Sequence, residues 1–283
     1  MKLEGSLRTD GPLPHAETPG VHAPVGELAA QRILIGILLF ATIFRVFAAL
    51  LHGNTVVALP GIYDQISYDG LARRVIGGYG FSFGQTWWPI TPAGEPTAHW
   101  SFLYTLYLAA VYALFGPQPL VARLIQAVLT GFLHSWLAWR VGRRIFGPTV
   151  GLVAAGVSAV YLYFVYYAGA LLTEPFYLTG ILWTVDVALR LAGVGQTRPR
   201  DNRQAAPRLR CWVEFGLAIG VTVLLRQLFL LFVPFLFGWL WWNRTTPQPA
   251  GGAKQRLTAH PPWRVVMGLV LTTVMVVLLV LPW

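Results

Sequence analysis

Charged residues and cysteine are both scarce in this 283-residue sequence. Asp, Glu, Lys and Arg make up 11% of it, whereas a soluble domain carries about 25%. Hydrophobic residues make up 55%, and the mean hydropathy is +0.57. The single cysteine, Cys211, excludes an intrachain disulfide and argues against a cysteine-based metal site. Because ~20 consecutive apolar residues span a bilayer core, this composition excludes an ordinary soluble protein and indicates an integral membrane protein.

Acidic residues are fewer than basic ones, with 11 Asp and Glu against 21 Lys and Arg and a net charge of +10. In a soluble protein this excess would suggest nucleic acid as a partner. In membrane proteins, however, Lys and Arg collect in cytoplasmic loops. We therefore expect membrane lipids as partners and no nucleic acid.

Residues 1–28 contain several prolines and few bulky apolar residues, which predicts a disordered cytoplasmic tail. No small-residue cleavage site follows the first apolar run, so we expect that run to stay in the protein as a membrane anchor. The remaining residues, 29–283, are predicted to form one transmembrane domain with a long outer loop at 53–118. The sequence stops at Trp283, directly after an apolar run, and we expect the natural protein to continue.

Apolar runs predict an all-α fold, a multi-pass bundle of membrane helices. The runs lie approximately at 33–51, 100–115, 120–141, 150–168, 176–192, 212–225, 228–242 and 265–281. Runs of this length and composition are typical of membrane helices rather than of strands.

The distribution of arginine decides how these runs cross the membrane. Basic residues cluster in three regions, at 140–144, 194–210 and 243–264. If every run spanned, with the tail inside, the first two regions would lie outside, against the positive-inside rule. Run 100–115 is short for a span and rich in aromatic residues, so we place it along the outer interface. All three basic regions then lie in the cytoplasm with the N-terminus, and Asp64, Glu174 and Arg226 lie outside.

The outer loop contains a candidate surface helix. Tyr68, Leu71, Ala72 and Val75 recur at helical spacing, which predicts a short amphipathic helix on the membrane. Asp64 lies at or before its first turn, where it could be a helix cap rather than a functional residue.

Several further motifs follow this helix in a recognisable order: Gly78-Tyr79-Gly80-Phe81, Pro92, Pro96, Trp100, Tyr104, Phe115-Gly116, Arg143-Arg144-Ile145-Phe146-Gly147, Leu172-Thr173-Glu174-Pro175 and Leu224-Leu225-Arg226-Gln227. Together with Asp64 and Tyr68, and from about residue 31 to the end, this order resembles the GT-C superfamily of membrane glycosyltransferases. The resemblance is greatest to family 39, which includes protein O-mannosyltransferases and the bacterial transferases that add aminoarabinose to lipid A. Gln65 stands where many relatives have Glu.

The resemblance implies a glycosyltransferase in a bacterial plasma membrane. It would move a sugar from a polyprenyl-phosphate donor to an acceptor at the outer face, with inversion at the anomeric carbon. We expect no cofactor, and the histidines show no metal-ligand spacing. Asp64 would be the general base. We place Tyr68, Glu174, Arg226 and His99 in substrate binding, with Arg226 on the leaving phosphate. The acceptor is a protein, a lipid or a glycan.

Each of these roles has a plainer alternative. Arg226 could be a structural residue at a helix break, and Glu174 could simply begin a helix before Pro175. His99 could be an ordinary interfacial histidine, and Asp69 is a rival base. For the whole chain, the alternatives are a transporter or lipid flippase and a non-catalytic membrane subunit.

Overall fold

The computed structural model describes residues 25–58, 62–195, 209–245 and 262–283. Within these residues all regular structure is helical, apart from isolated bridges, among them two in the loop at 77–101. The helices are α1 (Val25–His52), α2 (Asp64–Ile76), α3 (Phe102–Phe115), α4 (Pro119–Phe146), α5 (Pro148–Val160), α6 (Leu162–Gly169), α7 (Glu174–Ala192), α8 (Leu209–Leu225), the short 3-10 helix η2 (Gln227–Leu231), α9 (Val233–Thr245) and α10 (Pro262–Val280). The all-α prediction is confirmed at this level. Of the predicted tail at 1–28, residues 1–24 lie outside the described residues, and residues 25–28 form the first turn of α1.

Three helices, α1, α4 and α10, are long and apolar enough to cross a membrane. Helices α5 and α6 form a fourth candidate if they count as one span that is bent by 50°. Helix α7 is 19 residues long but carries Glu174, Asp186 and Arg190. Helices α8 and α9 are shorter, because the chain leaves the helical conformation at Arg226. Length and composition therefore support three or four spans, fewer than the apolar runs suggest.

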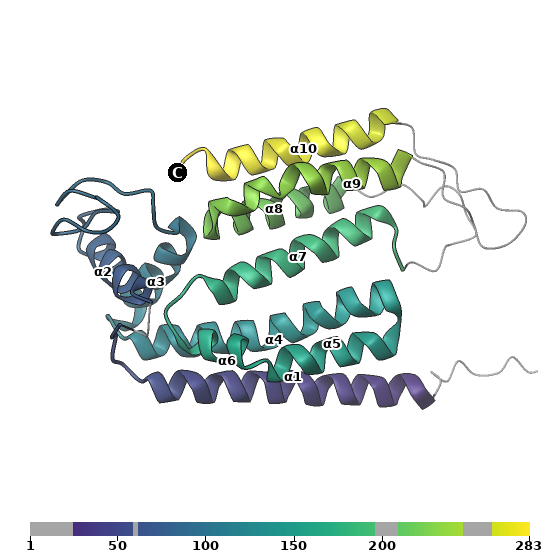
Figure 1. Ribbon diagram of the computed structural model, residues 1–283, viewed down its shortest axis with the longest axis horizontal. Helices are drawn as coiled ribbons and strands as arrows, with labels where there is room; N and C mark the ends of the chain where they lie inside the picture. The colour runs from purple at the N-terminus through teal and green to yellow at the C-terminus, as the bar shows by residue number, and fades with distance from the viewer. Residues whose placement is uncertain (1–24, 59–61, 196–208, 246–261) are drawn as a thin grey trace, which may run out of the picture.

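The long helices lie side by side along one axis, and α2 and α3 pack across one end (Figure 1). At this end, which we call the loop end, α1, α6, α8 and α10 finish and α4 and α7 begin. Run 100–115 thus forms α3 and does not extend along the bundle, as its length and composition predicted.

Arginines gather at the opposite end, which we call the basic end. They lie where α4 and α9 finish and where α8 and α10 begin: Arg140, Arg143, Arg144, Arg210, Arg244 and Arg264. Residues 196–208 and 246–261 of two predicted basic regions lie outside the described residues. The described parts of all three regions occupy one end of the bundle, as predicted.

Small residues let the helices approach closely. A Cβ atom on Gly131 of α4 would lie 2.7 Å from the Cα atom of Thr42 in α1, and one on Gly180 of α7 would lie 2.5 Å from the hydroxyl of Thr222 in α8. Close backbone contact through small residues is typical of helix packing in membranes.

Two polar side chains hold the bundle together, and both lie within predicted apolar runs. Arg45 is fully buried and donates to the Ser158 carbonyl at 2.8 Å, beside the bend between α5 and α6. It thereby satisfies a carbonyl close to the point where the helix is interrupted. Asp186, near the basic end, is buried and pairs with Arg140 at 2.8 Å, Arg190 at 3.2 Å and Arg144 at 3.6 Å.

Candidate active site

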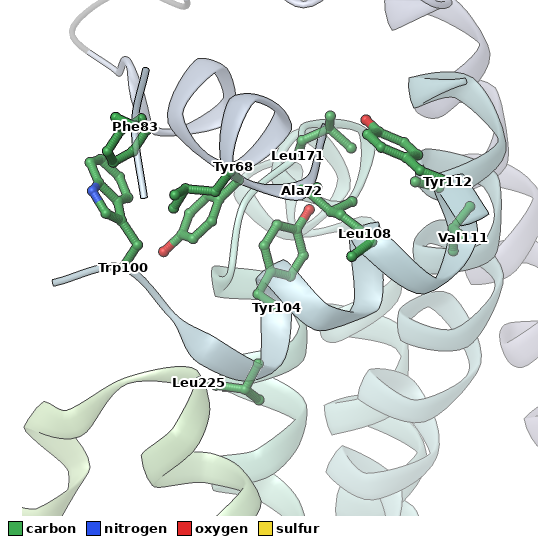
Figure 2. Close-up of a cluster of buried hydrophobic side chains, with 13 residues drawn as sticks. Tyr68, Ala72, Phe83, Trp100, Tyr104, Leu108, Val111, Tyr112, Leu171 and Leu225 are labelled. Carbon is green, nitrogen blue, oxygen red and sulfur yellow. The ribbon is translucent and has the colours of Figure 1, made fainter. Parts of the chain in front are cut away.

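Helix α2 forms as the sequence predicted and carries the first site residue in its first turn. Tyr68, Leu71 and Ala72 are buried against α3, so that the apolar face of α2 forms one side of the core at the loop end. Figure 2 shows the Tyr68 ring between Trp100 and Tyr104, with Leu225 of α8 close by. The N-cap of α2 is Tyr63, with no side-chain capping bond, and Asp64 is the first helical residue. The structure therefore gives Asp64 no capping hydrogen bond.

Tyr68 connects α2 to the start of α7 and the end of α8. Its hydroxyl accepts a hydrogen bond from the Ser101 backbone N–H at 3.4 Å, and it also contacts the Thr173 hydroxyl. Burial raises the pKa of Tyr68 to about 12, against the lowering effect of these hydrogen bonds. The negative charge of Asp64 raises the same pKa and the positive charge of Arg226 lowers it, so both charges act on this hydroxyl.

Arg226 and Glu174 meet across two helix ends. Arg226 has an extended backbone, with φ −149° and ψ 116°, between α8 and η2. Its Nη2 atom pairs with the Glu174 carboxylate, its Nε atom donates to the Thr173 hydroxyl at 3.3 Å, and the centre of its guanidinium lies 5.8 Å from the Tyr177 ring centroid. The Arg226 side chain remains 39% exposed. The loss of helical structure at this residue therefore presents a partly open cation at the loop end.

Three carboxylates lie in this region, and their partners distinguish them. Asp69 accepts from the Tyr112 hydroxyl at 2.6 Å and from Arg73 Nε at 2.8 Å, and Glu174 pairs with Arg226. The half-buried Asp64 carboxylate has no hydrogen bond or ion pair with any described residue. A proton acceptor needs a free oxygen within reach of the substrate. Of the two candidate bases, the geometry favours Asp64 over Asp69.

The orientation of α2 explains why these two aspartates differ. Residues three or four apart share a helix face, so Asp64 lies with Tyr68, towards α7 and α8. Gln65 and Asp69 share another face, which contacts Arg123 of α4 and Tyr112 of α3.

His99 lies apart from this cluster. Its exposed ring packs edge to face on Trp88 at 5.3 Å and on Trp100 at 5.4 Å between centroids. Trp100 in turn contacts Tyr68 at 5.4 Å. In the described part of the chain, no hydrogen bond joins the His99 ring to Thr173, Glu174 or Arg226.

The structure brings together four of the five predicted site residues, Asp64, Tyr68, Glu174 and Arg226. It adds two residues that sequence reasoning missed. Thr173 is buried and its hydroxyl lies between Arg226, Tyr68 and Glu174. Ser101 fixes the Tyr68 hydroxyl through its backbone and bonds the Leu224 carbonyl through its side chain at 3.1 Å. The position of Thr173 directly before Glu174 was the only signal for its role.

No group of three or more His, Cys, Asp or Glu side chains in the described ranges is arranged to hold a metal ion. The arrangement instead combines a free carboxylate, a neutral phenol and a partly exposed guanidinium at the end of an apolar bundle. Comparison with protein-family models, curated proteins and solved structures finds no match to this chain.

Proposed function

We propose that this protein is a GT-C-type membrane glycosyltransferase. It transfers a sugar from a polyprenyl-phosphate donor to an acceptor hydroxyl at the loop end of the bundle, with Asp64 as general base. The observation that carries the proposal is the convergence of Asp64, Tyr68, Glu174 and Arg226 at that one end. These residues come from three separate parts of the sequence, and the chain supports them with buried contacts to Thr173 and Ser101.

The chemistry follows from the charges. Asp64 accepts the proton of the acceptor hydroxyl while the oxygen of that hydroxyl attacks the anomeric carbon of the donor. The bond between this carbon and the phosphate oxygen breaks, and the leaving polyprenyl phosphate takes the bonding electrons. A single attack opposite the leaving group inverts the anomeric configuration. A fixed cation near the phosphate stabilises the charge that develops there.

Arg226 is suited to this second task. Its Nε and Nη2 atoms are held by Thr173 and Glu174, while Nη1 has no partner among the described residues. An arginine fork matches the geometry of phosphate oxygens. Glu174 then orients the guanidinium and offsets part of its charge in the absence of donor.

The position of the site agrees with a lipid-linked donor. The cluster lies at the ends of α7 and α8, next to helices that are long and apolar enough to cross a membrane. Arg140, Arg143, Arg144, Arg210, Arg244 and Arg264 lie at the opposite, basic end, whereas Arg73, Arg74, Arg123 and Arg226 lie at the loop end. If the positive-inside rule holds for this chain, the basic end is cytoplasmic, the protein is multi-pass, and the site faces the outside of a bacterial plasma membrane.

A transporter is less well supported. Transporters bind substrate near the middle of the membrane, often at broken helices. The helix bend at Tyr161 is of this kind, but the buried Arg45 beside it already donates to protein carbonyls. A cavity of about 350 Å³ between α7 and α9 is lined by apolar side chains alone, which does not suit a polar or ionic cargo.

The proposal is tested by donor specificity. The purified protein is reconstituted in vesicles with a bacterial membrane extract as the source of acceptors, and the transfer of radiolabelled sugar is measured. Polyprenyl-phosphate sugars are compared with the corresponding nucleotide sugars. We expect transfer only from the lipid-linked donors. Transfer from nucleotide sugars, or from no donor in a broad panel, would contradict the proposal.

A further inference from the structure

Arg123, one turn into α4, is a buried cation that forms no ion pair with a described residue, and the negative charge of Asp69 acts on it only from a greater distance. Its Nη1 atom donates to the carbonyls of Gly53 at 2.5 Å and His52 at 3.4 Å, and its Nη2 atom donates to Oε1 of Gln65 at 3.2 Å. The residue is 0% exposed. Burying an unpaired charge is costly. The carbonyls at the end of α1 offset part of that cost, because they carry the negative end of the helix dipole.

Gln65 is held at both ends of its amide. Its Oε1 atom accepts from Arg123, and its Nε2 atom donates to the Val57 carbonyl. The side chain is 1% exposed. Through these bonds, the first turn of α2 is tied to α4 and to the segment that follows α1.

Asp64 is the immediate neighbour of Gln65 and has no hydrogen bond of its own with the described residues. Its direction therefore depends on how the first turn of α2 is held. Tyr68, Leu71 and Ala72 fix α2 further along, from its second turn onward.

We propose that Arg123 and Gln65 are positioning residues, which hold Asp64 towards Tyr68 and Arg226 through the first turn of α2. This inference rests on the function proposed above. Misplacing a reacting group by about 1 Å costs up to about 100-fold in rate. The link between Arg123 and Gln65 is thus expected to affect turnover more than substrate affinity.

The chain offers a matched control in Asp69. This residue also anchors α2, through Tyr112 and Arg73, but it lies more than one turn beyond Asp64. Asp69→Asn loosens the same helix without releasing its first turn. A general loss of helix packing would affect Asp69→Asn and Gln65→Leu alike, whereas a positioning role predicts a difference.

The experiment measures kcat, the donor KM and thermal unfolding for the full chain in vesicles, with a polyprenyl-phosphate sugar as donor. For Gln65→Leu we expect kcat to fall about 10- to 100-fold while the donor KM stays within about twofold. Gln65→Glu keeps an acceptor for Arg123, strengthened by charge, but loses the donor to the Val57 carbonyl, so its kcat should fall less than that of Gln65→Leu. Asp69→Asn should remain within about threefold of wild type. Arg123→Lys, which lacks the fork that reaches both Gly53 and Gln65, should resemble Gln65→Leu.

Two results would overturn the positioning role. One is wild-type kcat in Gln65→Leu. The other is an equal loss in Gln65→Leu, Gln65→Glu and Asp69→Asn, which would assign the effect to helix packing. If wild type transfers sugar, Asp64→Asn does not and Gln65→Leu is unaffected, the positioning role fails and the proposed function stands. If wild type transfers nothing, both fail.

Discussion

Replacing Arg226 by Met should separate catalysis from stability. The substitution removes the guanidinium that contacts Glu174 and Thr173 while keeping an apolar side chain of similar length. The effect on stability should be small, because the Arg226 and Glu174 side chains are 39% and 20% exposed. Solvent-exposed ion pairs contribute about 0–1 kcal/mol, and a largely buried polar group that loses its partner costs about 1–3 kcal/mol. We therefore expect the free energy of unfolding to fall by about 1–2 kcal/mol.

The effect on transfer should be far larger. Removing one preorganised group that stabilises developing charge costs about 100- to 1000-fold in rate, or about 3–4 kcal/mol. We therefore expect Arg226→Met to lower kcat by about 100-fold or more. Arg226→Lys keeps the charge but cannot reach Glu174 and Thr173 together, and should retain intermediate activity.

The assay follows the release of polyprenyl phosphate in vesicles, beside thermal unfolding of the same samples. Arg73→Met is the matched control, because Arg73 also pairs with a carboxylate at the loop end and is 44% exposed. It should leave kcat within about twofold of wild type, since it stabilises no developing charge. Wild-type kcat in Arg226→Met, or an equal loss in Arg73→Met, would refute the role of Arg226.

Three further predictions test the core around Tyr68 and the packing of the bundle. Burial raises the pKa of Tyr68 to about 12, above the ~10 of an unfolded tyrosine. Its contribution of about 2–3 kcal/mol to the free energy of unfolding should therefore be complete below about pH 10 and disappear as pH rises to about 12. A Tyr68→Phe variant whose free energy of unfolding falls as much as that of wild type over this pH range would contradict this prediction. Asp186→Asn should lower the free energy of unfolding by about 2–4 kcal/mol, because it leaves three arginines around a buried neutral group; unchanged thermal unfolding would count against the network. Gly131→Ala should lower the free energy of unfolding by about 1–3 kcal/mol, because the new Cβ would lie 2.7 Å from the Thr42 backbone. Gly156→Ala is the control and should be neutral or stabilising, because no atom lies within 4 Å of its Cβ. Equal effects of the two substitutions would refute the close contact of α1 with α4.

Much of the helix layout could be predicted from the sequence, because hydropathy records which segments avoid water. Each predicted apolar run is largely helical, including the short run that forms α3. The bend at Tyr161 was not predictable, since run 150–168 contains no proline that would mark a kink. Its supporting residue, Arg45, lies more than 100 positions away in the sequence.

The candidate site, too, could be predicted from the sequence only in part. The charge pattern predicted that Asp64, Glu174 and Arg226 share one end of the bundle, and the structure places them there. The contacts of Thr173 with Arg226 and of Gln65 with Arg123 join residues that are 53 and 58 positions apart. Such long-range hydrogen bonds leave no periodic signal in one sequence, and only the folded chain reveals them.

The central claim is that Asp64 accepts the proton of an acceptor during sugar transfer. The most direct measurement is the initial rate of labelled-sugar transfer from polyprenyl phosphate by wild type, Asp64→Asn and Asp69→Asn in the same vesicles. We expect normal membrane insertion of all three, loss of transfer in Asp64→Asn, and near wild-type transfer in Asp69→Asn. Full transfer by Asp64→Asn would contradict the claim.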